Sequence, residues 1–87
     1  MYALVINCGS SSLKFALIHA EDNETIVNGA AERLGSPEAE ITIKYEDDLQ
    51  KKLQEPTHLG AVTEIFDFLK THNLAEKITA VGHRVVH

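Results

Sequence analysis

The residues of this chain best suited to chemistry lie in one short polar turn near its start. Asn7 and Gly9 precede three consecutive serines, and Lys14 follows two residues after the last of them. Gly9 permits a positive φ and a close approach of the backbone to a ligand, and successive N–H groups of a turn can enclose an anion. The hydroxyls of Ser10 and Ser12 add donors, and Lys14 adds a positive charge. This combination predicts a site that binds phosphate groups.

Hydrophobic segments on both sides of the turn indicate two strands that hold it as a hairpin. Residues 2–7 form a continuous apolar run, which predicts a strand buried on both faces. Residues 12–19 predict the second strand, with Ser12 and Lys14 on one of its faces. The two common phosphate loops have a different spacing and lead into a helix. An ordinary β-turn, in which glycine and serine are frequent, is the alternative interpretation.

The middle of the chain predicts two more strands and a connection. Residues 25–34 favour a strand that Gly29 weakens, and residues 39–46 alternate between apolar and polar side chains as a half-buried strand does. The turn between them is expected at residues 35–38. Residues 47–56 are charged and lack periodicity, so we predict a solvated loop or a weak helical turn there.

A helix and a final strand are predicted in the last third of the chain. The helix opens at Pro56-Thr57, and Asn73 is a plausible end for it. Residues 78–86 then predict an apolar strand. The helix carries an apolar stripe that we interpret as core packing, formed by Leu59, Val62, Ile65, Phe66 and Leu69.

Composition excludes several classes of function. The net charge of −5 argues against a surface for nucleic acid or for anionic membranes. No apolar run approaches the roughly 18 residues that a membrane-spanning helix needs, and the first residues lack the basic segment of a secretory signal. The single cysteine, Cys8, suits a reducing cytosol and is interpreted as a small residue that fills space. The five histidines show no metal-ligand spacing, so no zinc site is predicted.

Two motifs resemble those of the acetate kinase family. The run Asn7-x-Gly9-Ser10-Ser11-Ser12-x-Lys14 resembles the first signature of that family, and the run from Val81 to His87 resembles its Gly-His-Arg-Val-Val-His sequence. Acetate kinases belong to the superfamily of sugar kinases, heat-shock proteins and actin, in which the first hairpin usually starts with aspartate. The asparagine here favours the acid kinases.

The resemblance implies an α/β fold with a ribonuclease-H-like mixed sheet. That sheet has antiparallel hairpins, a crossover helix, and a parallel strand whose end lies near the first hairpin. Chains of the family are several times longer than this one, so residues 1–87 are expected to be a truncated, N-terminal part of the first ribonuclease-H-like domain. The fragment alone is predicted to have no kinase turnover.

The resemblance also implies an activity and a set of site residues. Acetate kinases transfer the γ-phosphoryl group of ATP reversibly to acetate, which gives acetyl phosphate and ADP. Lys14, Ser10 and Ser12 would bind the nucleotide, and Asn7 would lie in the shell of a Mg²⁺ (or Mn²⁺) ion. Arg84 would bind the substrate carboxylate or the transferring phosphoryl group, and no catalytic residue is expected within the chain. The family implies a cytoplasmic location and a homodimer for the full-length enzyme.

Three alternatives stay open. Propionate kinase shares both motifs. A protein of another class, a stand-alone phosphate-binding or scaffold module without catalysis, would also fit the turn. Arg84 could instead form a structural salt bridge with one of the thirteen carboxylates, and structural roles are expected for His83 and His87.

Overall fold

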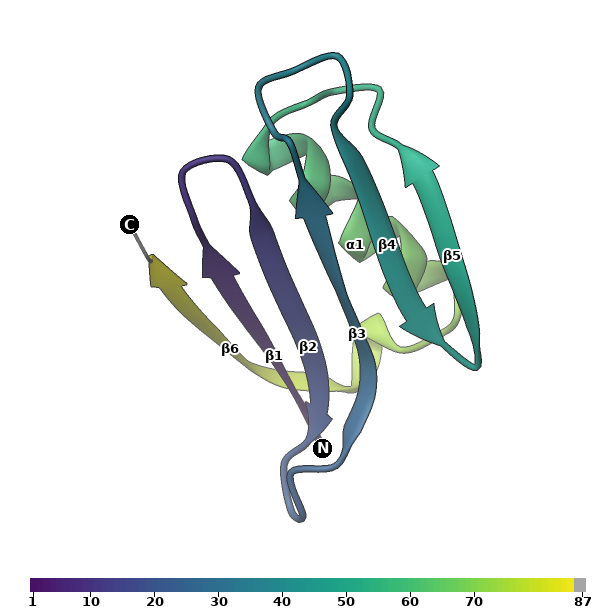
Figure 1. Ribbon diagram of the computed structural model, residues 1–87. Coiled ribbons are helices and arrows are strands. Elements are labelled where there is room, and N and C mark those ends of the chain that lie inside the picture. Colours follow the sequence, from purple (N-terminus) through teal and green to yellow (C-terminus); the bar gives the residue numbers. More distant parts are fainter. Residues whose placement is uncertain (86–87) are drawn as a thin grey trace.

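The computed structural model describes residues 1–85, with side chains as far as Gly82. These residues form a mixed sheet of strand order β5-β4-β3-β2-β1-β6, with an α-helix packed across one face (Figure 1). A short 3₁₀ turn, η1 (Ala75–Lys77), connects the helix to the last strand. The strands and the helix have these bounds: β1 Tyr2–Cys8, β2 Leu13–His19, β3 Thr25–Glu32, β4 Glu40–Tyr45, β5 Asp47–Lys52, α1 His58–Thr71 and β6 Ile78–Val85.

The sheet combines an antiparallel meander with one parallel strand. Strands β1 to β5 pair antiparallel in chain order, and β6 returns to pair parallel with β1. A parallel pair needs a crossover connection, which α1 and η1 supply. The predicted arrangement of hairpins, helix and parallel strand is confirmed, with a fifth antiparallel strand, β5, besides the four predicted before the helix. Val86, the predicted end of the last strand, lies outside the described residues.

The hydrophobic core lies between the sheet and α1. Leu13, Phe15 and Leu17 of β2 are buried there, and the residues between them are not, which confirms the predicted alternation. The prediction that β1 is buried on both faces is wrong. Its Leu4 and Ile6 are buried, but Val5 between them is only half-buried, because α1 covers one face of the sheet at this strand.

Strand β5 corrects the prediction of a loop or helical turn over residues 47–56. It pairs along its whole length with β4, yet all six of its residues are exposed. An edge strand has one neighbour and little cover, so it buries no apolar stripe and shows no periodicity in sequence. Charged side chains on such a strand also discourage edge-to-edge aggregation. The Lys51 Nζ atom does reach α1, where it lies 2.8 Å from Glu64 Oε2.

Helix α1 begins and ends close to where the sequence predicted. The Thr57 hydroxyl caps its first turn by accepting from the Gly60 N–H at 2.9 Å. Asn73, with φ of 59°, follows the helix in a left-handed conformation, and its N–H donates to the Lys70 carbonyl. The helix end is therefore a cap of the left-handed type, for which asparagine is suited.

The buried side of α1 differs from the predicted stripe at one residue. Ile65 and Leu69 are fully buried as predicted, but Leu59 is 70% exposed, and Ala61 takes a core position instead. A helix turns about 100° per residue, so Leu59 points about 120° away from Ile65. His58, by contrast, precedes Ile65 by two turns and lies on the side that faces the sheet.

Candidate phosphate-binding site

The turn between β1 and β2 is a tight hairpin closed between Gly9 and Ser12. The Gly9 N–H donates to the Ser12 carbonyl oxygen at 2.9 Å, so it is not available to a ligand. Gly9 does not adopt the positive φ that glycine permits. Because β2 begins at Leu13, Ser12 belongs to the turn. The prediction that Ser12 shares a strand face with Lys14 is therefore wrong. The exposed Ser10 and Ser11 form the tip of the hairpin.

Three candidate residues occupy one row across three adjacent strands. Asn7 pairs in register with Lys14 across β1 and β2, and with Arg84 across β1 and β6. Because neighbouring strands lie about 4.8 Å apart, the backbones at Lys14 and Arg84 are about 10 Å apart, with Asn7 between them. Asn7 and Lys14 alternate with the buried Ile6 and Leu13, so both lie on the sheet face opposite α1.

Lys14 contributes a positive charge to this row. Its side chain is exposed, and none of the three ion pairs between described side chains includes it. An ammonium group without a carboxylate partner is suited to attract an anion. Asn7 is half-buried and offers both an amide oxygen and amide N–H groups. The side chains of Arg84 and His83, like all of His87, lie outside the described part of the structure.

Loops from three parts of the chain meet at the hairpin (Figure 1). The Leu34 N–H, in the β3–β4 loop, donates to the Ser11 carbonyl oxygen at 2.9 Å. The neighbouring Gly35 N–H donates to the Pro56 carbonyl oxygen at 2.7 Å. His58, the first residue of α1, places its Nε2 atom 2.7 Å from the Gly9 carbonyl oxygen. The hairpin is therefore held from behind by two other segments, which also bond to each other.

Sequence reasoning missed His58. The histidines were tested for metal-ligand spacing, and nothing in the sequence connects residue 58 with residue 9. One local signal was present: the Pro56-Thr57 pair that opens the helix makes His58 its first residue, and the 3.6-residue period puts it on the side of Ala61 and Ile65. Its partner across 49 residues of chain follows only from the packing of α1 on the sheet.

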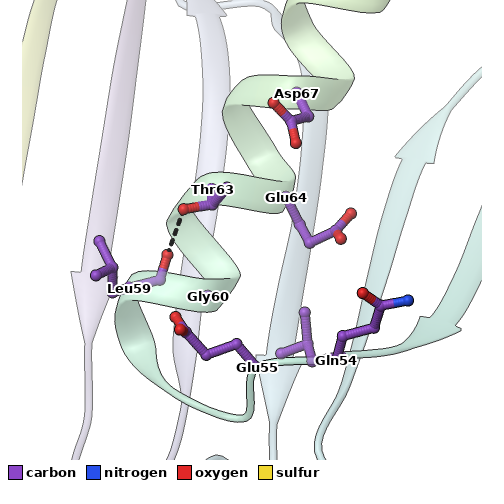
Figure 2. Close-up of a pocket in the computed structure, with 8 residues that line it drawn as sticks. Gln54, Glu55, Leu59, Gly60, Thr63, Glu64 and Asp67 are labelled. Atoms are coloured by element: carbon purple, nitrogen blue, oxygen red, sulfur yellow. Dashed lines mark hydrogen bonds between the residues drawn. The ribbon is translucent and has the colours of Figure 1, made fainter.

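A hollow elsewhere on the described surface has the wrong chemistry for phosphate. It measures about 420 Å³ and sits over the start of α1 and the end of β5. Figure 2 shows that Glu55, Glu64 and Asp67 line it. Carboxylates repel a phosphate anion, so this hollow does not extend the candidate site. A smaller recess of about 190 Å³ adjoins the hairpin, between Ser10 and His58.

The described residues offer few ligands for a metal ion. No group of three or more His, Cys, Asp or Glu side chains gathers anywhere among them. Mg²⁺ in phosphate-transferring sites keeps several waters and takes one or two protein oxygens besides the phosphates. The Asn7 amide oxygen fits such a minor contribution, directly or through a water.

Cys8 contributes little to the candidate site. The Cys8 side chain is half-buried and packs against the core, which agrees with a structural role. Over the described residues, no helix has the length and apolar character that crossing a membrane would take.

Solved structures with a similar fold include a propionate kinase and an acetate kinase. A propionate kinase from Francisella tularensis superposes with a TM-score of 0.91 at 40% identity, over 99% of this chain and 22% of the other. The acetate kinase of Porphyromonas gingivalis gives a TM-score of 0.84 at 33% identity, over 99% of this chain and 23% of the other.

Comparison of sequences gives the same class. The acetate kinase of Dichelobacter nodosus is 48% identical over an alignment 89 residues long, which covers 99% of this chain and 22% of the relative. That of Chromobacterium violaceum is 48% identical over 85 residues, 97% of this chain and 21% of the relative. The model of the acetokinase family matches residues 2–87. The chain belongs to the acetokinase family, and it spans about a fifth of the length of these relatives.

Proposed function

We propose that this chain supplies the phosphate-binding hairpin and a substrate-binding arginine to an acetate kinase. The reaction moves the γ-phosphoryl group of ATP to acetate, in either direction, with acetyl phosphate and ADP as the other pair. The observation that carries the proposal is the row of Arg84, Asn7 and Lys14 at the hairpin end of three adjacent strands. Residues 1–87 would then be the N-terminal part of the first ribonuclease-H-like domain of the whole enzyme.

The chemistry requires positive charge, because both reactants are anions. Two like charges at contact distance repel by about 4 kcal/mol at an effective dielectric constant of about 20. In the proposal, the Lys14 ammonium offsets charge on the nucleotide phosphates, and the hydroxyls of Ser10 and Ser12 donate to phosphate oxygens. The planar guanidinium of Arg84 holds the acetate carboxylate by paired hydrogen bonds. These groups bind and orient the reactants.

A divalent cation, Mg²⁺ or Mn²⁺, would complete the charge balance. When bound, such an ion would neutralise negative charge on the phosphates. Of the proposed residues, Asn7 would contribute one oxygen or an ordered water to it. Acidic ligands would come from segments outside residues 1–87.

A graft tests the proposal directly. Residues 1–87 would replace the matching segment of the Dichelobacter nodosus acetate kinase, to give what we call the graft enzyme. We expect it to form acetyl phosphate from ATP and acetate, measured by trapping with hydroxylamine. A graft enzyme that folds, as judged by a cooperative thermal transition, but shows no activity would contradict the proposal.

Propionate kinase is the second candidate, since the Francisella tularensis protein of that name superposes closely. We propose that the residues selecting the acid lie mostly outside this chain. Grafts of residues 1–87 onto the Dichelobacter acetate kinase and onto the Francisella propionate kinase should then each keep the acid preference of the recipient. A graft with a changed ratio of kcat/KM for acetate and propionate would place a specificity residue within the chain.

The chain by itself is predicted to be inactive, because its residues form one side of a two-sided site. The 87-residue chain, incubated with ATP, Mg²⁺ and acetate, should yield no more acetyl phosphate than its Lys14→Ala variant. Turnover above that control would contradict the prediction. Saturable binding of phosphate by a chain that folds cooperatively, combined with an inactive graft enzyme, would favour a stand-alone binding module instead.

A further inference from the structure

The hydrogen bond between His58 and Gly9 joins the start of α1 to the hairpin. The His58 Nε2 atom lies 2.7 Å from the Gly9 carbonyl oxygen in a partly buried position. A carbonyl oxygen only accepts, so Nε2 must carry a proton and donate. The bond thus fixes which ring nitrogen is protonated in the neutral histidine, and it gives the Gly9 carbonyl a partner outside the hairpin.

This bond changes the hydrogen bonding within the turn. A β-turn from Gly9 to Ser12 would ordinarily use the Gly9 carbonyl to accept the Ser12 N–H. Among the described residues that bond is absent, and the Gly9 carbonyl is bonded to His58 instead. The Ser12 N–H is therefore left for another acceptor.

The geometry of the peptide bond extends the effect to the serines. In a planar trans peptide the C=O and the N–H of the next residue point in opposite directions. Holding the Gly9 carbonyl toward α1 therefore aims the Ser10 N–H away from it. The Leu34 N–H holds the Ser11 carbonyl in the same manner, which aims the Ser12 N–H away from the β3–β4 loop.

The first turn of α1, which carries His58, is held firmly in place. Thr57 caps the helix at the preceding residue, and Ala61 and Ile65, on the same side of α1, are fully buried against the sheet. A methyl group added at Gly60 would lie 2.1 Å from the Glu55 carbonyl oxygen, so the chain entering the helix packs directly on its first turn. His58 therefore has little freedom to withdraw from Gly9.

We infer that His58 is a positioning residue for the phosphate-binding hairpin. By holding the Gly9 carbonyl, it presents the Ser10 and Ser12 N–H groups to the polyphosphate of the nucleotide without touching that ligand itself. The inference rests on the proposed function for the identity of the ligand. The ordering of the hairpin by His58 does not depend on it and can be measured separately.

The first experiment uses the 87-residue chain and no ligand. Amide relaxation by NMR would compare the native chain with His58→Phe, which keeps a ring but cannot donate, and with His58→Gln, whose amide nitrogen takes the place of Nε2. We expect lower order parameters for the Ser10, Ser11 and Ser12 amides in His58→Phe and native values in His58→Gln. His72→Phe, at the exposed C-cap of the same helix, is the matched control and should leave the hairpin unchanged.

A further variant, His58→Asn, guards against a His58→Phe chain that does not fold. His58→Asn is a polar amide like His58→Gln but is shorter by one methylene group, too short to reach the Gly9 oxygen. It should loosen the hairpin as His58→Phe does. Native order in the hairpin of a folded His58→Phe chain or of His58→Asn would overturn the inference.

The second experiment measures kinetics in the graft enzyme. His58→Phe should raise the KM for ATP about tenfold, the equivalent of one lost hydrogen bond, with the KM for acetate unchanged, and His58→Gln should restore it. An unchanged KM for ATP in an active His58→Phe graft would overturn the role in phosphate binding. If the native graft enzyme is inactive, the proposed function fails, and the NMR comparison still decides whether His58 orders the hairpin.

Discussion

Arg84 is the register partner of Asn7 across the parallel pair of β1 and β6. The two residues belong to the two motifs at opposite ends of the sequence, and the parallel return of the chain brings them side by side. Asn7 is at the same time the register partner of Lys14. The proposed anion-binding hairpin and Arg84, the residue proposed to bind the substrate carboxylate, thus lie at one end of the sheet (Figure 1). A larger offset in the β1–β6 register would have separated them.

Removal of the Lys14 charge should impair activity without affecting the fold. Lys14→Ala in the graft enzyme is expected to lower kcat/KM for ATP by about 100-fold, the scale of losing one preorganised electrostatic contact. Its side chain is exposed, so the unfolding free energy should change by no more than about 0.5 kcal/mol. Lys44→Ala is the control, since Lys44 is also an exposed strand lysine. Equal activities of the two variants would remove Lys14 from the site.

Replacement of Arg84 should affect acetate more than ATP. Arg84→Ala in the graft enzyme is expected to raise the KM for acetate or lower kcat by about 100-fold. Arg84→Lys should restore little, because an ammonium cannot form the paired contacts of a guanidinium. Arg33→Ala serves as the control, since Arg33 lies on the surface and pairs with Glu40 at 3.3 Å. Steady-state kinetics with each substrate varied would reveal an unaffected Arg84 variant, which would refute the proposed role.

Truncation of two apolar residues of α1 should have opposite outcomes. Ile65 is fully buried, and Ile65→Ala should lower the unfolding free energy of the 87-residue chain by about 2–5 kcal/mol. Leu59 is 70% exposed, and Leu59→Ala should change it by no more than about 0.5 kcal/mol. Urea unfolding followed by circular dichroism measures both. Comparable losses would mean that the side of α1 facing the core is not the one described.

A methyl group at Gly29 should destabilise the centre of the sheet. An added Cβ would lie 2.1 Å from the Thr42 carbonyl oxygen and 2.7 Å from Phe15 Cε1. Gly29→Ala should therefore cost about 1–3 kcal/mol or more in unfolding free energy. Gly82→Ala is the comparison, because an added methyl there meets no described atom within 4 Å. Thermal unfolding of the two variants at the same midpoint would contradict this.

Gly29 has a role in β3 that the sequence indicated only in part. The sequence indicated that it weakens β3, since glycine packs no side chain in a strand. The structure shows why the residue is needed, because β4 and Phe15 occupy the space that a side chain would fill. Close packing between strands leaves no trace in the sequence of either strand, so it could not be predicted.

The sequence by itself determined the features that arise from a few neighbouring residues. Alternation marked β2 and β4, Thr57 marked the start of α1, and Asn73 marked its end, because burial periodicity and capping act within one or two turns of chain. The two motifs likewise sufficed for the family. Each of these signals is complete within a short segment.

Tertiary structure decided what depends on partners far along the chain. The charged segment became β5 because β4 offered it an edge, and Leu59 became exposed because the sheet meets another side of α1. The bond from His58 to Gly9 and the register of Arg84 with Asn7 exist only once α1 has packed and β6 has returned to β1. Such contacts arise from the relative placement of whole elements, which local patterns of polarity do not specify.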